Sequence, residues 1–334
     1  MTPELLTWVR DNAARWDREP VTRADTDRLA AAGLYALTGP PELGGVSLPQ
    51  HREAAELLAG ASPDLWFVWF QHGPVVRMVA AVEELQSLLP DLCSGRTQAG
   101  VAFSHLRGGH PSITAKRDGD GWLLEGRQPW GTGFGIADVF LVGAHVPESD
   151  EVLLGLVPAE EVGSAGELDL MTMRGTSTHA LRLDGARLAD SRVVVRKTYD
   201  EWTAADRVSN SNVQPSTFGL ASAALDLLAP VDPETELALR ARVDAVRTEA
   251  YALIDEQPPE VDLERRLELR AEALLLAMSC ATAAVASRGG RAVGLNDPAQ
   301  RLLRAAAFQL IHAQAPHVRA ATMSAIRRST AAGG

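Results

Sequence analysis

A block of short runs that alternate apolar and polar residues lies in the middle of this chain, between two long stretches of helical pattern. The block starts at about residue 98 and ends near residue 195, and clusters of Gly, Asp and Pro separate its runs. The runs read AGVAFSH, SITAKRD, WLLEGRQ, ADVFLVGA, EVLLGLV and HALRLDGARL. Because a period of two is typical of half-buried strands, this regular spacing predicts a small β-barrel or sandwich.

Helical patterns account for the rest of the chain. Residues 3–97 show apolar spacing near 3.6, with a rigid Gly- and Pro-rich loop at 38–46 and one strongly apolar helix at 64–82. Four more helices are predicted at about 200–229, 233–256, 260–291 and 297–329, and these would form an up-and-down bundle. Pro215 lies within the first of them and should kink it.

These patterns together predict an α+β multidomain fold. We expect an N-terminal helical domain at 1–97, a β-domain at 98–195 and a C-terminal four-helix bundle at 196–334.

Composition narrows the classes of function. The chain carries 32 basic and 43 acidic residues, a formal net charge of −11, with no basic stripe, which argues against nucleic-acid binding. No uninterrupted apolar run is long enough to span a membrane and residues 1–20 are charged throughout, so we expect no membrane association and a cytoplasmic location. The two cysteines, Cys93 and Cys280, form neither a disulfide framework nor a metal-binding pattern. An anionic ligand could still bind locally through backbone N–H groups.

The stretch GWLLEGRQPWGTGFGIADVFLVGA, residues 121–144, contains the most distinctive local motif. Trp130 offers an aromatic face and Thr132 a hydroxyl, two positions apart on one side of an extended chain, while Gly131 and Gly133 allow a close backbone approach. Such a pair suits an aromatic cofactor whose edge needs a hydrogen bond. A hairpin turn with a half-buried Trp explains the same residues equally simply.

The order of several motifs resembles the acyl-CoA dehydrogenase family of FAD flavoproteins over nearly the whole chain. LAAAGLYALTGPPELGGVSL is similar to the family's "L…GL…P…GG.G" segment, and EELQSLLPDLCSGRTQAGVAFSH to its approach to the β-domain. The residues from Gly126 to Ala144 resemble "G.K.WITN…AD…V.A". MRGTSTHALRLDGARLADSRV and GGRAVGLNDPAQRLLRAAAF resemble "G.RGS.T..L.F.D..VP…N" and "GG.GY…P.E.L.RDA".

The resemblance implies FAD bound between the β-domain and the C-terminal bundle. Trp130 would lie along the flavin ring and the Thr132 hydroxyl would reach the edge with the reactive nitrogen, while Ser104 replaces a cofactor-contacting threonine. Gly289 and Gly290 would abut the adenosine of a neighbouring subunit's FAD, so a homodimer or homotetramer is implied. In the family's reaction a carboxylate removes a proton next to a thioester while the flavin accepts a hydride.

The chain departs from the family at both positions where a base is expected. Ala313 occupies the position of the usual glutamate, and Ser209 occupies the alternative position on the first helix of the bundle. The "TE…GSD" segment corresponds to Ser104-His-Leu-Arg-Gly-Gly-His-Pro111, which lacks the acidic and Ser-Asp positions. The "R..FG" element that grips a neighbour's FAD has no counterpart between Leu228 and Glu234.

Histidines are the remaining acid–base candidates, since only His titrates near neutrality without perturbation. His105 is the first candidate because its loop maps beside the flavin, and His110 and His312 follow it. Asn210 and Asn212 are expected to line the same cavity. For each of these residues a purely structural role is the alternative. We assign His72 and His179 structural roles, and we expect the aromatic cluster Trp66, Phe67, Trp69 and Phe70 to be core packing, not a ligand cage.

Three functions remain open. The first is an FAD-dependent oxidoreductase with altered chemistry, oxidase- or monooxygenase-like or a specialised dehydrogenation, acting on a small molecule such as an acyl thioester. The second is a non-catalytic partner subunit that forms a hetero-oligomer with an active homologue. The third is a redox-neutral enzyme that uses His105 or Ser209 without flavin.

Overall fold

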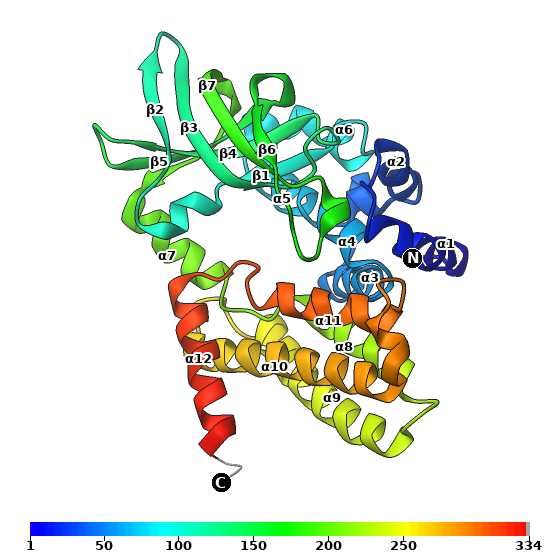
Figure 1. Ribbon diagram of the computed structural model, residues 1–334. Helices are drawn as coiled ribbons and strands as arrows, with labels where there is room; N and C mark the ends of the chain where they lie inside the picture. Colours follow the sequence, from blue (N-terminus) through cyan, green and yellow to red (C-terminus); the bar gives the residue numbers. More distant parts are fainter. Residues whose placement is uncertain (332–334) are drawn as a thin grey trace.

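The computed structural model describes residues 1–331, so the last three residues of the expected C-terminal bundle lie outside the described part. Helices precede and follow a sheet along the chain, and the expected helix–β–helix fold is confirmed (Figure 1).

The central sheet has eight strands, and all six predicted runs contribute to it. The strands are β1 (Ala99–Ala102), β2 (Ile113–Asp118), β3 (Gly121–Gly131), β4 (Val139–Val146), β5 (Glu151–Pro158), β6 (Gly163–Glu167), β7 (His179–Ala189) and β8 (Val193–Thr198). Their order is β6-β7-β3-β2-β4-β5-β8, with β1 added parallel to β4. The sequence reading missed β6 and β8, because GSAGE and VVVRKT show no apolar–polar alternation.

The two faces of the sheet pack against different partners. On β5, Leu154 faces the helices that cover one side, whereas Leu153 joins a second core formed by the sheet residues themselves. This follows from the alternation of side chains along a strand. Strands β3 and β4 do not form a hairpin, because β2 lies between them. The simple hairpin interpretation of residues 121–144 is therefore wrong.

The N-terminal part is helical, as expected. Its helices are α1 (Pro3–Trp16), α2 (Arg23–Ala31), α3 (Leu48–Ala61), α4 (Pro63–Phe70), α5 (His72–Ala80) and α6 (Leu89–Cys93). The single apolar helix expected at 64–82 is in fact two helices, α4 and α5, that meet at Gln71. Pro74 has no N–H to donate to the Phe70 carbonyl, so the helical hydrogen-bond ladder is interrupted there.

The C-terminal part differs from the expected four helices at two points. The helices are α7 (Tyr199–Ser209), α8 (Pro215–Leu228), α9 (Pro233–Glu256), α10 (Leu263–Arg288), α11 (Pro298–Gln309) and α12 (Pro316–Ala331). Pro215 does not kink a helix but begins α8, so the first expected helix is two. The last expected helix is also two, since residues 310–315 leave the helix and Ala313 has φ +51°. Helix α7 packs on the sheet through Trp202.

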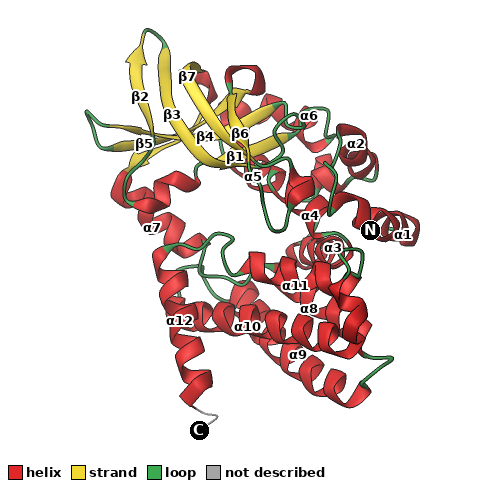
Figure 2. Cartoon of the chain, viewed as in Figure 1, coloured by secondary structure: helices red, strands yellow, loops and turns green. Residues whose placement is uncertain are grey.

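One hydrophobic core joins the N-terminal helices to the bundle. Helices α1, α3 and α4 share it with α8, α9, α10 and α11 (Figure 2). The stretch Leu263–Val293, which contains α10, is long and apolar enough by composition to cross a membrane. Just over half of its most apolar window is buried inside the structure, so packing in the bundle accounts for its apolar character.

Helices α3 and α8 approach closely at two glycines. A Cβ on Gly60 would lie 2.7 Å from the Gly219 carbonyl oxygen, and one on Gly219 would overlap the Glu56 backbone. The contact therefore leaves no room for a side chain at position 219 of α8.

We predict that Gly219→Ala lowers the free energy of unfolding by about 1–3 kcal/mol, because the added methyl forces the helices apart. The matched control is Gly294→Ala, where φ is −73° and the nearest atom to a new Cβ is 3.5 Å away. Urea unfolding of both variants measures the effect. Equal stability of the two would show that the close contact is not needed.

Candidate functional site

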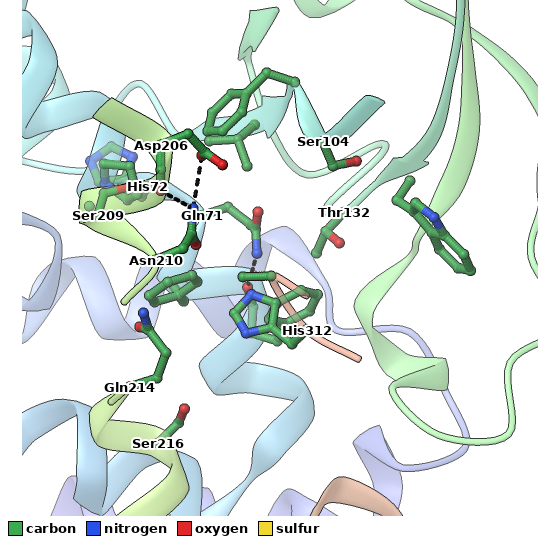
Figure 3. A pocket seen from close by; sticks show the side chains of 18 of the residues that line it. Gln71, His72, Ser104, Thr132, Asp206, Ser209, Asn210, Gln214, Ser216 and His312 are labelled. Atoms are coloured by element: carbon green, nitrogen blue, oxygen red, sulfur yellow. Dashed lines mark hydrogen bonds between the residues drawn. The ribbon is translucent and has the colours of Figure 1, made fainter. Parts of the chain in front are cut away.

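A cavity of about 1040 Å³ lies between the sheet, helix α7 and the helical parts of the chain (Figure 3). Most of its wall is apolar, and a few polar side chains converge on it. Ser104 and Thr132 come from the β-domain, and Asp206, Ser209 and Asn210 from α7 or its end. Gln214, Ser216 and His312 lie on the helical side.

The end of strand β3 forms the wall on the side of the sheet. Trp130 is 52% exposed and lines the cavity, so its ring is available to a ligand. Gln128, which is buried, donates from Nε2 to Ser104 Oγ at 2.7 Å and to the Trp130 carbonyl at 2.9 Å. Because Ser104 Oγ accepts from Gln128, its own hydrogen is free to donate into the cavity. Gly133 has φ +79°, which lets the chain leave the strand beside Thr132.

Thr132 belongs to a buried row of hydroxyl groups. Its Oγ1 lies 3.0 Å from Thr178 Oγ1, which lies 2.7 Å from Thr176 Oγ1. Thr176 in turn donates to the Met173 carbonyl at 2.7 Å. All three threonines are buried, and Thr132 and Thr178 line the cavity.

The turn that carries Thr176 is fixed to the N-terminal helices. Gly175 donates its N–H to Asp64 Oδ1 at 2.9 Å and accepts from the Val21 N–H at 2.7 Å. Both Met173 and Ser177, at the two ends of the turn, have left-handed backbone conformations, with φ +58° and +47°. Non-glycine residues adopt this conformation only where their surroundings enforce it.

Aromatic rings form one side of the cavity, which we call the aromatic floor: Trp66, Phe67, Phe70, Phe308 and His312. The His312 ring is parallel to Phe308 and edge-on to Phe67 at a centroid distance of 5.0 Å. Burial, together with the positive charges of Arg270 and Arg107, lowers the pKa of His312 to about 3. This side chain is therefore a neutral aromatic surface. The cluster Trp66, Phe67, Trp69 and Phe70 packs in the core, as expected, and its rings also face the cavity.

Asp206 is the only acidic residue among the cavity-lining residues of the described chain. Its carboxylate accepts two hydrogen bonds from Arg107 Nε, at 2.9 and 3.1 Å, and one from Arg107 Nη2 at 2.8 Å. Asn210 Nδ2 also donates to Asp206 Oδ1 at 2.8 Å. The carboxylate is thus already engaged by a fork of donors. Asp206 was missed by the sequence reading, although it lies three residues before Ser209 and so on the same face of α7.

Cationic side chains outnumber this carboxylate around the cavity: Arg52, Arg77, Arg107, Lys197 and Arg319. Arg52 pairs with Asp255 and Arg107 with Asp206. Arg77 has no ion pair within residues 1–331, and burial lowers its pKa. The positive charge of Arg77 is therefore free to attract an anionic ligand.

His105 does not occupy the position of a base. Its side chain is buried and does not line the cavity. Nε2 is hydrogen-bonded to the Gly143 carbonyl at 3.0 Å, and Nδ1 accepts from the Ser112 N–H at 3.1 Å. Burial lowers the pKa of His105 to about 4. With both ring nitrogens engaged, His105 holds its own loop against the sheet, and the catalytic role that we expected for it has no structural support.

The two family base positions have different surroundings. Ser209 lines the cavity and donates to the Asp206 carbonyl at 3.1 Å. Ala313 lies in the segment between α11 and α12, which the buried Arg270 anchors through the His312 and Ala313 carbonyls. Arg270 also binds the Asn210 carbonyl at 2.6 Å, so it ties this segment to the end of α7. Neither Ser209 nor Ala313 supplies a carboxylate.

The remaining candidates divide into cavity and non-cavity residues. Asn210 and Asn212 line the cavity as expected, but the Asn212 amide oxygen accepts from Arg266. His72 has both nitrogens in hydrogen bonds to backbone groups, in line with the structural role assigned to it. His110 is exposed and His179 stacks on Phe134, and neither lines the cavity. Gly289 and Gly290 lie on the surface after α10, also away from it.

Solved structures with the same arrangement identify the fold. FkbI, from the biosynthesis of the methoxymalonyl extender unit of Fk520, matches with a TM-score of 0.79 and 19% identity, covering 97% of this chain and 98% of that one. Butyryl-CoA dehydrogenase from Megasphaera elsdenii matches with a TM-score of 0.78 and 15% identity over 97% and 94%. The chain has the acyl-CoA dehydrogenase fold.

The same fold also carries other reactions. Dibenzothiophene monooxygenase TdsC from Paenibacillus sp. A11-2 matches with a TM-score of 0.77 and 19% identity, over 96% of this chain and 94% of that one. No protein-family model and no curated protein matches the sequence of the chain. At these identities the likeness concerns the fold, and the chemistry must be argued from the cavity.

The anchor between Asp64 and Gly175 makes stability depend on pH. Burial raises the pKa of Asp64 to about 7 from an ordinary value of 3.8. The folded protein holds this proton more tightly than the unfolded chain does, so the protonated Asp64 carboxyl favours the folded state. This contribution to the free energy of unfolding is complete below pH 3.8 and is lost as the pH rises toward 7.

We predict that Asp64→Asn gains stability relative to the natural protein as the pH rises from 4 to 7, since Asn keeps the acceptor for the Gly175 N–H but does not ionise. Urea unfolding at several pH values gives the difference. The exposed Asp11, changed to Asn, is the control and should show no trend. A flat difference for Asp64→Asn would mean that the carboxyl is not buried as described.

Proposed function

We propose that this protein is a flavin-dependent oxidoreductase that binds FAD in the cavity and reacts without a carboxylate base. The observation that carries the proposal is that the exposed ring of Trp130 and the oxygen of Thr132 line the cavity, while its single carboxylate is engaged by Arg107 and Asn210. Supporting it, the fold is one on which flavin enzymes with and without acyl-CoA substrates are built.

The donors and acceptors of the wall fit an isoalloxazine ring. Trp130 offers an exposed indole face for stacking, and Ser104 offers a free hydroxyl hydrogen. Gln71 donates its amide to the Phe67 carbonyl, which leaves its own carbonyl oxygen as an acceptor. Arg77 offers a positive charge for the diphosphate or for an anionic substrate carrier. Trp130, Ser104 and Gln71 would contact the flavin ring, and Arg77 would neutralise the negative charge of the diphosphate. Gly133 would allow the backbone to approach the ring closely.

A bound flavin would supply two-electron redox chemistry, including reaction with oxygen. The protein's own residues would orient the substrate and exclude water, since the aromatic floor is apolar and His312 is neutral. Neither His312 nor the engaged Asp206 is suited to removing the weakly acidic proton beside a thioester. The proposal is therefore an oxidase- or monooxygenase-like reaction or a specialised dehydrogenation of a small, apolar substrate, with an acyl thioester as one class.

We further propose a homodimer or homotetramer. Val293 is 82% exposed and Leu295 is 56% exposed, and both follow Gly289 and Gly290 on the surface. Exposed apolar residues next to a glycine pair suit contact with another subunit. The alternative, a non-catalytic subunit of a hetero-oligomer, predicts instead that the chain purifies as an unstable or flavin-free species without its homologue.

We predict that the purified protein binds FAD and quenches its fluorescence, because the ring stacks on an indole. Trp130→Leu should weaken binding by up to roughly tenfold, the value of one aromatic contact. The control is Trp8→Leu, because Trp8 packs on Trp16 away from the cavity. Fluorescence titration measures both variants. If the natural protein binds no FAD, the proposed function is wrong.

We also predict that straight-chain acyl-CoAs do not bleach the visible absorbance of the flavin-loaded protein under anaerobic conditions, because no carboxylate is free to take the α-proton. Dithionite provides the positive control for reduction. Bleaching that Asp206→Asn abolishes would contradict this prediction and identify Asp206 as a base.

A further inference from the structure

The hydrogen bonds between the hydroxyl groups of Thr132, Thr178 and Thr176 all run in one direction, from donor to acceptor. A carbonyl oxygen can only accept, so the single hydrogen of the Thr176 hydroxyl is used in its bond to Met173. Thr176 Oγ1 must then accept from Thr178, and Thr178 Oγ1 must accept from Thr132. The hydrogen of Thr132 is therefore used in its bond to Thr178, and Thr132 has only lone pairs left for a ligand.

The surrounding turn holds this direction in place. The bond from Thr176 to Met173 closes the turn at residues 173–176, whose first residue has left-handed φ and whose Gly175 is fixed on both sides by Asp64 and Val21. Reversing the row would release the Met173 carbonyl from the Thr176 hydroxyl and leave one hydroxyl hydrogen without a protein partner. In this buried setting the loss of a hydrogen bond is unfavourable.

We propose that the site selects the two-electron-reduced form of the flavin over the oxidised form, an inference that rests on the proposed function. The reactive nitrogen of an oxidised isoalloxazine is an acceptor, whereas in the reduced ring it carries a hydrogen. If the reactive nitrogen lies at Thr132, as the resemblance implies, an acceptor at this position is complementary to the reduced nitrogen and not to the oxidised one.

A count of hydrogen bonds gives the size of the preference. With reduced flavin the row keeps its three bonds and gains a fourth from the flavin N–H to Thr132. With oxidised flavin the Thr132 hydrogen must turn to the flavin. If Thr132 turns alone, its bond to Thr178 is lost, and if the whole row reverses, the bond to Met173 is lost, so either arrangement gives three bonds in all. One net hydrogen bond corresponds to roughly fivefold tighter binding of the reduced form. The same ratio makes the midpoint potential of the bound flavin about 20 mV more positive than that of free flavin, at 29.6 mV per tenfold.

The test measures dissociation constants for oxidised FAD and for dithionite-reduced FAD under anaerobic conditions, by calorimetric titration of the full-length protein. We expect the natural protein to bind the reduced form roughly fivefold more tightly. Thr178→Val removes the acceptor of the Thr132 hydrogen and frees that hydrogen for the cavity, so the preference should vanish or invert. Thr172→Val is the matched control, because Thr172 is a buried threonine of the cavity wall outside the row. It should keep the preference.

If Thr178→Val does not fold, Thr132→Val serves as the test variant. We expect it to bind oxidised FAD and reduced FAD with similar dissociation constants. Oxidised FAD that binds as tightly as reduced FAD, or tighter, overturns the inference while leaving the proposed function intact. A preference that survives in Thr178→Val or Thr132→Val also overturns it, since the preference would then have another source. Failure to bind either form overturns the proposed function itself.

Discussion

The cavity depends on the way in which one turn of the sheet is fixed to the N-terminal helices. Gly175 has no room for a side chain, because a Cβ there would overlap the Trp16 carbonyl oxygen. Its N–H and carbonyl are held by Asp64 and by Val21, which come from outside the sheet. The positions of Thr176 and Thr178 follow from this clamp, and that of the Thr132 hydroxyl follows from theirs. The helices that carry the aromatic floor thus also set the opposite wall.

Charge around the cavity is the reverse of the charge of the whole chain. The protein has a formal net charge of −11, yet the cavity wall holds several cations and the single carboxylate of Asp206. Histidines that could act as bases are also scarce around the cavity. Burial, together with the nearby Arg77 and Arg52, lowers the pKa of His51 to about 4, and burial lowers that of His72 to about 4. A site of this kind retains positive charge and cannot store a proton on histidine near neutral pH.

Local periodicity was sufficient to predict the order of helical, strand and helical regions and six of the eight strands, because the apolar pattern of each element is short-range. The prediction failed at Gln71, before Pro215 and at Ala313. At each of these places the helix breaks although the helical apolar pattern continues on both sides. In the site, Trp130, Thr132 and Ser104 could be predicted to act together, since a recognised motif places them at the end of one strand and the loop beside it. The ion pair between Arg107 and Asp206 could not be predicted, because the two residues are 99 positions apart. His105 was misjudged because its burial depends on strand β4 and on the loop at Ser112.

The backbone around Ala313 is held by a buried cation. Arg270 is buried beneath the segment that contains Ala313, and burial, reinforced by the nearby Arg107, lowers its pKa to about 10. Its guanidinium satisfies carbonyls at the ends of two helices, from Asn210 and from His312. The chain leaves the helix after Gln309, and Arg270 supplies donors for the His312 and Ala313 carbonyls. A carboxylate introduced at position 313 would lie near a buried guanidinium, on a backbone that is not helical. Position 313 therefore differs from a helical position in its backbone conformation as well as in its side chain.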